Sequence, residues 1–362
     1  MRGWMLAATA VVCLGCGGND DNNEGAPDLA TATGADLGMP ADLAQPGAVD
    51  LAFGSDTDGS VACTPAAGAT AARYVWNAMT VPLTASDFAY DLNGDGRADN
   101  QLGNIAGALA GQGFDLQAGI DGAITGGQSI TLVDEQSTDP TFGSDACAAT
   151  DVVPGVAMAA PDFSGNGRFT IDGTVAPGHF FGPIASGAFV SQPPPAQARV
   201  PVVVHKLMLP LFGVTPVDVY GARIQYVRAA SGQLGGGQLN GAIRQEDIQT
   251  KVVPAVAALF NQKVTADPTS SGSMQLLSIF DNGGTANAAC GATCKNLDGS
   301  CAAAGDGQIS DCEVGTNGII KNVLAPDVQM FDAAGNYHPN PLNTKKDSLS
   351  VGVGFTAVPA LF

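Results

Sequence analysis

The sequence predicts an α+β protein in which an antiparallel, β-rich domain with a few packed helices follows a disordered N-terminal tether. Three observations favour this class. The chain has 362 residues, of which 48 are glycine and only 14% are charged, a composition typical of turn-rich β structure rather than of a helical bundle. Apolar and polar residues alternate in several stretches after residue 167. Helical spacing of apolar residues is confined to a few short segments.

The N-terminus predicts export. Residues 1–15 have the form of a signal peptide, because a positive start precedes an apolar run from Trp4 to Val12 that is too short to span a bilayer permanently. Leu14-Gly15-Cys16 resembles a bacterial lipobox, although Cys13 stands where that motif usually has leucine. The resemblance implies cleavage before Cys16, lipid attachment to Cys16 and, because glycine follows, a place at the outer membrane or cell surface. The alternative is an ordinary secretory signal with two incidental cysteines.

Residues 16–62 are predicted to be the lipidated cysteine followed by a disordered acidic linker. Residues 17–62 contain no Lys or Arg, and Gly, Ala, Pro and Thr fill most of the positions between the acidic residues. Such a segment buries too little apolar surface to offset the entropy lost on ordering. Residues 63–362 then form an extracytoplasmic α+β domain, and its first part, 63–150, is a candidate for a helical subregion.

The apolar pattern places the elements of this domain. We expect a helix–loop–helix over residues 80–115, with a short first helix ending near Tyr90, and a helix over 116–124. Strands are expected at 129–133, through much of 167–227, and at the C-terminus from 349 to 356. Two further helices are expected over 245–264 and 311–324. Pro254 should kink the first of these or mark its true start.

The cysteines predict disulfides. Without Cys13 and Cys16, six remain, an even number in an exported chain, which implies three bridges. We expect Cys63 to pair with Cys147, and the four clustered residues to pair among themselves: Cys290, Cys294, Cys301 and Cys312. A zinc site in that cluster is the rival interpretation.

The formal net charge of −19 constrains the partners. It argues against nucleic acid, because phosphate binding needs Lys and Arg. It also argues against electrostatic contact with anionic lipid head groups, so membrane contact should run through the lipid anchor. An acidic chain is suited to collecting divalent cations.

The segment from Asp91 to Asp99 indicates a chemical function more directly than any other part of the sequence. Side-chain oxygens at alternate positions, with Gly96 after the third, allow one loop to wrap a hard cation such as calcium. The expected side-chain ligands are Asp91, Asn93, Asp95 and Asp99, and Arg97 would offer its carbonyl while its side chain points away. A metal-free Asn/Asp/Gly turn is the alternative.

The pattern resembles the calcium loops of dockerins, thrombospondin type 3 repeats and EF-hands, within an overall likeness to uncharacterised bacterial lipoproteins. This resemblance covers about nine to twelve residues and implies calcium as the cofactor. The chain departs from a full EF-hand at the twelfth loop position, where Leu102 replaces the bidentate glutamate.

Two further segments carry part of the same pattern. Residues from Asp306 to Glu313 match the back half of an EF-hand, so both are candidate ligands, but Ser310-x-x-Glu313 equally predicts a capping box. A weaker echo lies in the 327–347 segment, where Asp327 and Asp332 are candidates for a shared cation site. Chance explains this echo unless the 327–347 loop proves adjacent to the Asp91 loop.

No motif names a catalytic site. The chain has three histidines and lacks the zinc-protease, nucleophile-elbow and Walker patterns, so an enzyme is not favoured. The first expectation is a lipid-anchored, calcium-stabilised cell-surface or periplasmic protein with a binding or structural role. A carrier of lipid or another apolar ligand is the alternative, suggested by the apolar segments 201–211 and 217–227. A secreted hydrolase is the third. The protein or apolar-ligand partner is unknown.

Overall fold

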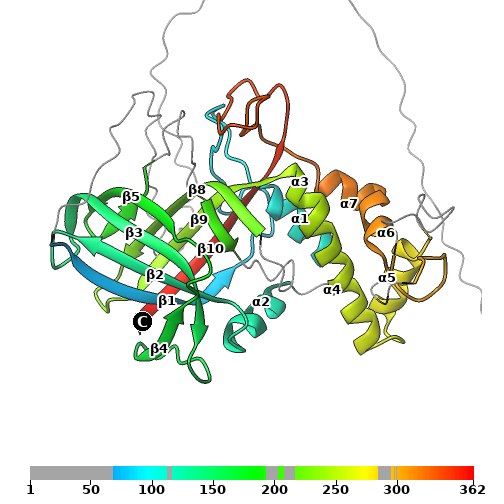
Figure 1. Ribbon diagram of the computed structural model, residues 1–362, viewed down its shortest axis with the longest axis horizontal. Coiled ribbons are helices and arrows are strands. Elements are labelled where there is room, and N and C mark those ends of the chain that lie inside the picture. The colour runs from blue at the N-terminus through cyan, green and yellow to red at the C-terminus, as the bar shows by residue number, and fades with distance from the viewer. Residues whose placement is uncertain are drawn as a thin grey trace, which may run out of the picture. The chain divides into compact units, whose positions relative to one another are not determined.

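The computed structural model describes residues 68–111, 116–192, 203–207, 217–283, 295–296, 298 and 300–362. The predicted signal peptide, Cys16 and the acidic linker lie outside the described residues. The predicted class is confirmed: the domain is an antiparallel β structure with several helices. Figure 1 shows the strands forming one body, with helices α4–α7 gathered at one side of it.

Eight strands close into an antiparallel barrel. Their order around the ring is β1 (Thr70–Thr80), β2 (Ile130–Ser137), β3 (Ser144–Ala157), β5 (Gly178–Ala185), β6 (Ala188–Val190), β8 (Val217–Arg228), β9 (Leu234–Arg244) and β10 (Ser348–Leu361). The ring closes where β1 pairs antiparallel with β10, from Tyr74 opposite Pro359 to Thr80 opposite Gly354. The first and last described strands are therefore neighbours.

Aromatic side chains fill the interior of the barrel. Trp76 on β1 stacks on Phe355 of β10, with ring centroids 4.3 Å apart. Tyr226 of β8 lies edge-on to Phe355 at 6.4 Å and stacks with Phe189 of β6 at 5.2 Å. All four of these side chains are at most 3% exposed. The core thus joins strands from opposite sides of the ring.

Two strands lie off the ring. β4 (Gly167–Ile171) pairs antiparallel with β3 and parallel with the end of β10, and β7 (Val203–Leu207) pairs with β8. Phe169 of β4 covers a second apolar cluster on the outer face of the barrel, which includes Val75, Leu132 and Val358. The strands in this region therefore bury both faces.

The helices share the main core with the barrel. α1 (Gln101–Ala110) packs Leu102, Ile105 and Leu109 into the same cluster as Trp76, and α2 (Leu116–Thr125) contributes Ile120 and Ile124. α3 (Gln245–Asp247), a π-helical turn (Ile248–Val252) and α4 (Val253–Ala266) form the helix expected over 245–264. Pro254 lies inside this continuous helical run, directly after the π-helical turn, so the helix starts at Gln245 and not at the proline.

The remaining helices are shorter than expected or were not expected. α5 (Ser271–Phe280) has no counterpart among the expected elements. The helix expected over 311–324 is broken into α6 (Asp311–Thr316) and α7 (Gly318–Val323), because Asn317 caps the second helix by accepting the N–H groups of Ile319 and Ile320. The stretch 63–150 contains α1 and α2, but also β1, β2 and the first half of β3.

The prediction of a short helix that ends near Tyr90 is wrong. Residues 83–88 form turns, because Asp87 Oδ2 accepts the N–H groups of Leu83 and Thr84, both at 2.9 Å. Phe88 then adopts a positive φ of 50°, and its ring lies against Gly354 on the outer face of β10. A Cβ on Gly352 would collide with the Phe88 carbonyl, so glycine is required for this close approach. The segment that leads into the acidic loop is thus fixed on the barrel wall.

The Asp91 loop and the 327–347 segment are adjacent. Leu92 belongs to one buried apolar cluster with Val328, Met330, Phe331 and Tyr337, which covers the outer faces of β8 and β9. In Figure 1 the cyan loop before α1 and the red loop before β10 lie side by side. The similar sequences of these two loops were expected to be a coincidence unless the loops proved adjacent, and they are adjacent.

Candidate metal centre

A short antiparallel bridge closes the acidic loop. Tyr90 and Asp99 exchange main-chain hydrogen bonds of 3.3 and 2.9 Å, and α1 begins two residues later. Asn100 fixes the exit, because its Nδ2 donates to the carbonyls of Asp87 and Gly352 and its Oδ1 accepts the Gly352 N–H at 2.9 Å. The loop is therefore held at both ends by the barrel.

Asp91 organises the backbone of the loop. Its Oδ1 accepts the N–H groups of Gly94 (2.7 Å) and Asp95 (3.1 Å), and its Oδ2 accepts that of Gly96 at 2.9 Å. Gly94 and Gly96 have φ values of +80° and +81°, a conformation that side chains with a Cβ rarely adopt. The glycines at these positions therefore set the curvature that turns the next carboxylates inward.

The structure brings three of the predicted ligands together. Carboxylate oxygens of Asp91, Asp95 and Asp99 all lie within 4.8 Å of one another, so the group could hold a metal ion. Asn93 is 3% exposed, and its Oδ1 accepts the Asp95 N–H at 3.1 Å, while its buried Nδ2 has no acceptor in the part of the chain that the structure describes. The Arg97 side chain is exposed, as expected. Among the described residues, this is the one such cluster of acidic, His or Cys side chains.

Asp99 carries an uncompensated charge. Burial raises the pKa of Asp99 to about 7, and the negative charges of Asp327, Asp95 and Asp91 contribute to the rise, while Lys346 opposes it. Its Oδ2 is buried and has no hydrogen-bond partner among the described residues. A carboxylate in this position is stabilised either by a proton or by a cation. Sequence reasoning identified Asp99 as a candidate ligand, but the buried and negatively charged surroundings that raise its pKa come from the fold.

Asp327 brings a fourth negative charge near the triad. Ser350 on β10 donates its N–H to Asp327 Oδ1 at 2.7 Å and its hydroxyl to Oδ2, and the same hydroxyl accepts the N–H of Gln101 at the start of α1. Burial raises the pKa of Asp327, and the Ser350 hydrogen bonds partly offset this. Asp332, the other candidate of the echo, accepts hydrogen bonds from Ala334 and Asn336, which lower its pKa, as in a tight turn.

The second candidate loop is satisfied by hydrogen bonds. Glu313 is 0% exposed and forms the capping box with Ser310, and its Oε1 accepts the Gly283 N–H at 2.6 Å. Asp306 Oδ2 accepts hydrogen bonds of 2.8 Å from Ala303 N and Asn296 Nδ2. The capping interpretation is thus confirmed, and metal binding by Asp306 and Glu313 stays a prediction.

Sequence reasoning missed the residue that replaces the absent first aspartate of this second loop. Asp281, at the end of α5, accepts the N–H groups of Gly305 and Gly307 at 2.6 and 2.8 Å, as Asp91 does with Gly94 and Gly96. It lies 24 residues before Gly305, so no local pattern could have identified it.

Only three of the six cysteines in the disulfide prediction are among the described residues. Cys147, Cys301 and Cys312 are among the described residues, whereas Cys63, Cys290 and Cys294 lie outside them. The three predicted bridges, and the rival zinc site, therefore stay predictions.

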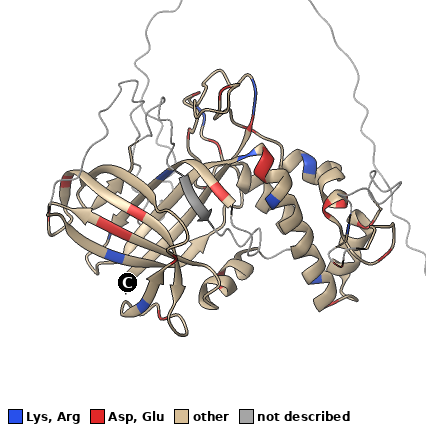
Figure 2. Cartoon of the chain, viewed as in Figure 1, with Lys and Arg blue, Asp and Glu red and all other residues tan. Residues whose placement is uncertain are grey.

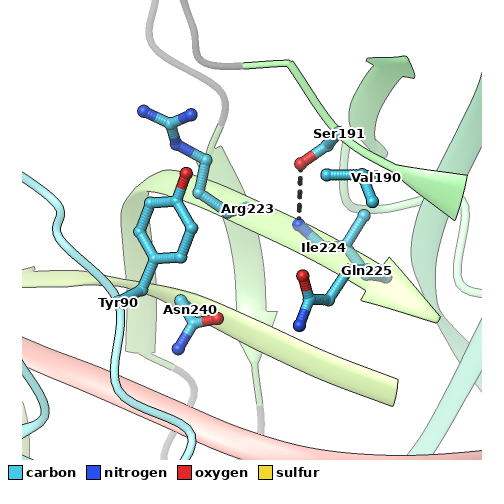
Figure 3. A pocket seen from close by; sticks show the side chains of 7 residues that line it. All are labelled: Tyr90, Val190, Ser191, Arg223, Ile224, Gln225 and Asn240. Atoms are coloured by element: carbon cyan, nitrogen blue, oxygen red, sulfur yellow. Dashed lines mark hydrogen bonds between the residues drawn. The ribbon is translucent and has the colours of Figure 1, made fainter. Parts of the chain in front are cut away.

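A small pocket lies beside the acidic loop. It has room for about one water molecule and is lined by Tyr90, Val190, Ser191, Arg223, Ile224, Gln225 and Asn240 (Figure 3). The sequence showed no sign of it, because these residues come from four separate segments. The only link visible beforehand is that Tyr90 directly precedes Asp91.

Comparison with protein-family models, with curated proteins and with solved structures finds no match to this chain. Within the described part of the chain, no helix has both the length and the apolar character needed to cross a membrane.

Proposed function

We propose that this is an exported, lipid-anchored protein of the outer membrane or cell surface in which calcium fixes a loop on a β-barrel for a binding role. One observation carries the proposal: the half-buried Asp99 carboxylate has a pKa raised to about 7, and its oxygen lies within 4.8 Å of carboxylate oxygens of Asp91 and Asp95. Oxygen ligands of this type suit calcium, and extracytoplasmic sites of this class typically stabilise structure.

The acidic loop is well placed to transmit such stabilisation. Its ends pair through Tyr90 and Asp99, its exit is bonded to Gly352 of β10, and Leu92 packs under the 327–347 segment. Neutralising the triad would therefore stabilise contacts between the loop, the barrel wall and the neighbouring segment.

Figure 2 shows Lys and Arg scattered over the barrel and helices, which accords with the expectation that nucleic acid is not the partner.

Calcium should raise the melting temperature, and a chelator should lower it. A ligand present at about 100 times its Kd contributes about 2.7 kcal/mol, which corresponds to a shift of about 5 °C for a domain of this size. The measurement is a thermal unfolding curve at pH 8 in millimolar calcium and in EDTA. A melting curve that the chelator leaves unchanged would contradict the calcium proposal.

Asp99→Asn is the diagnostic variant for this measurement. Without metal, a raised carboxyl pKa contributes stability below the ordinary value of 3.8, and this contribution is lost as pH rises through about 7. In EDTA at pH 8, Asp99→Asn should therefore melt above the wild type, and calcium should raise its melting temperature less. Glu246→Gln, which also removes one negative charge but on a side chain that is 71% exposed, should keep the full calcium shift.

The proposed lipid anchor can be tested by replacing Cys16. Because a lipid needs this thiol, Cys16→Ser should release the protein from the membrane fraction and abolish its labelling by a radioactive fatty acid. Cys13→Ser is the matched control and should leave both unchanged. Membrane association and labelling that persist in Cys16→Ser would contradict the anchor.

The carrier and hydrolase alternatives receive no comparable support. The rings of Trp76, Phe355 and Tyr226 occupy the space within the barrel that an apolar ligand would need. His179 lies 2.6 Å from Asp151, but this pair is on the surface, where the His179 side chain is 55% exposed. We therefore propose neither function.

A further inference from the structure

An apolar face is exposed where β3, β4 and the end of β10 meet. Val156 on β3 is the register partner of Thr170 on β4. Leu361 on β10 pairs with Arg168 on β4, whose carbonyl also accepts the N–H of Met158 just after β3. Register partners and residues two apart share one face of a sheet, so these five side chains lie together. In Figure 1 β4 lies beside the end of β10.

This surface, which we call the β4 face, is open to solvent. Met158 is 67%, Val156 53% and Leu361 51% exposed, and the two other residues of the face are exposed as well. Phe169, on the opposite side of β4, is only 2% exposed. Single exposed apolar side chains are common, but three on one sheet face form a patch, and such patches mark contacts with proteins or membranes.

Arg168 places a cation at the centre of this patch. The ion pairs among the described residues include Arg73 with Asp134 but none with Arg168. A guanidinium among apolar side chains fits a phospholipid surface, because its stem lies along apolar groups while its N–H groups bind a phosphate. A second copy of the chain fits less well, since a two-fold contact through the β4 face would bring two Arg168 side chains together.

The rest of the chain joins the described domain on the same side. β1 begins at Thr70, and Arg73 Nη1 donates to the carbonyl of Phe362, the residue after Leu361. About 10 Å of strand separates Thr70 from Arg73. The chain that leads back to Cys16 therefore enters the domain near the β4 face, so a domain that is anchored at Cys16 is able to turn this face to the bilayer.

We propose that the β4 face rests on the phospholipid bilayer that holds the lipid anchor. The inference rests on the anchor proposed above and adds a second membrane contact to it. Because the anchor confines the domain, its effective concentration at the bilayer is high, and a small apolar patch is enough for contact. The net charge of −19 gives no attraction at a distance, so the contact depends on the apolar residues and on Arg168 at short range.

The test is the oxidation of Met158 by hydrogen peroxide in the mature, lipidated protein on phosphatidylcholine vesicles in calcium. Met274 on α5, which is 56% exposed, is the internal control. Mass spectrometry of the peptides gives the ratio of the Met158 rate to the Met274 rate. Relative to the unlipidated Cys16→Ser variant in solution, this ratio should fall at least about 5-fold on vesicles, because the bilayer covers Met158 and leaves Met274 in water.

Leu361→Asp is the diagnostic variant, because a charged side chain at the centre of an apolar contact opposes burial in the bilayer. On vesicles it should return the oxidation ratio to the value of Cys16→Ser in solution. Leu342→Asp, the same change on a leucine that is 78% exposed in another part of the domain, should keep the fall in the ratio. Circular dichroism checks that both variants are folded.

Three results would overturn the assignment. These are an unchanged ratio in protein that floats with the vesicles, slow Met158 oxidation in Cys16→Ser without vesicles, which would indicate a protein contact, and protection that persists in folded Leu361→Asp. The outcome is separable from that of the anchor. Protein that floats with an unchanged ratio contradicts only the bilayer contact, whereas protein that does not float contradicts the lipid anchor and, with it, this inference.

Discussion

Replacing Glu135 by glutamine should lower the free energy of unfolding by about 3–5 kcal/mol, because it leaves Arg228, whose side chain is only 18% exposed, without its counter-ion. Glu135 on β2 is 1% exposed, and its Oε2 lies 2.5 Å from Arg228 Nη2. The guanidinium of Arg228 is stacked 3.9 Å from the Phe142 ring centre and cannot turn to water without losing this contact. Chemical denaturation followed by circular dichroism measures the change.

A double variant of Glu135 and Arg228 serves as the control for this prediction. Burial raises the pKa of Glu135, and Arg228 only partly offsets this, so the pair is costly to bury even when intact. The double variant Glu135→Gln, Arg228→Met should therefore recover most of the stability lost by Glu135→Gln. Glu246→Gln, at a surface ion pair, should change stability by less than about 1 kcal/mol. Equal stability of Glu135→Gln and the wild type would show that the ion pair is not desolvated.

Replacing Trp76 by alanine should also cost about 3–5 kcal/mol. Trp76 is 1% exposed and stacks on Phe355 with an interplanar angle of 9°, at the seam where β1 meets β10. Removing the indole opens a cavity that the surrounding strands cannot close, since they belong to a closed ring. The measurement is again the denaturation midpoint and slope.

Leu83→Ala is the matched control for this variant, because Leu83 is 64% exposed and its truncation should change stability by less than about 0.5 kcal/mol. A loss below about 1 kcal/mol for Trp76→Ala would mean that the interior of the barrel relaxes around the cavity. It would also revive the carrier alternative, which needs an adaptable interior.

Local patterns were enough where apolar side chains mark one face of an element and small or polar residues the other. The alternation from Leu349 to Thr356 predicted β10, and its apolar members do lie in the main core while Gly352 and Gly354 lie against Phe88. Helical spacing likewise predicted α1, α2 and α4. The Asp91 loop could also be predicted locally, since the hydrogen bonds that Asp91 accepts connect residues no more than five apart.

β1 escaped prediction because both of its faces are buried. Tyr74 and Trp76 face the barrel interior, while Val75 between them joins the outer cluster under β4. Three consecutive buried residues show neither the period of a half-exposed strand nor that of a helix. Without β1 the sequence predicts a sheet, but it cannot predict that the sheet closes.

By itself the sequence determined the antiparallel class, most helices and the three aspartates that meet in one loop, because each depends on residues close together in the chain. Only the tertiary structure decided the rest. It closed the barrel by pairing its first and last strands, brought Asp327 near Asp99, and placed Arg223 beside Tyr90. These contacts join residues more than 100 positions apart, and no local spacing encodes them, since they arise from packing apolar faces around a common core.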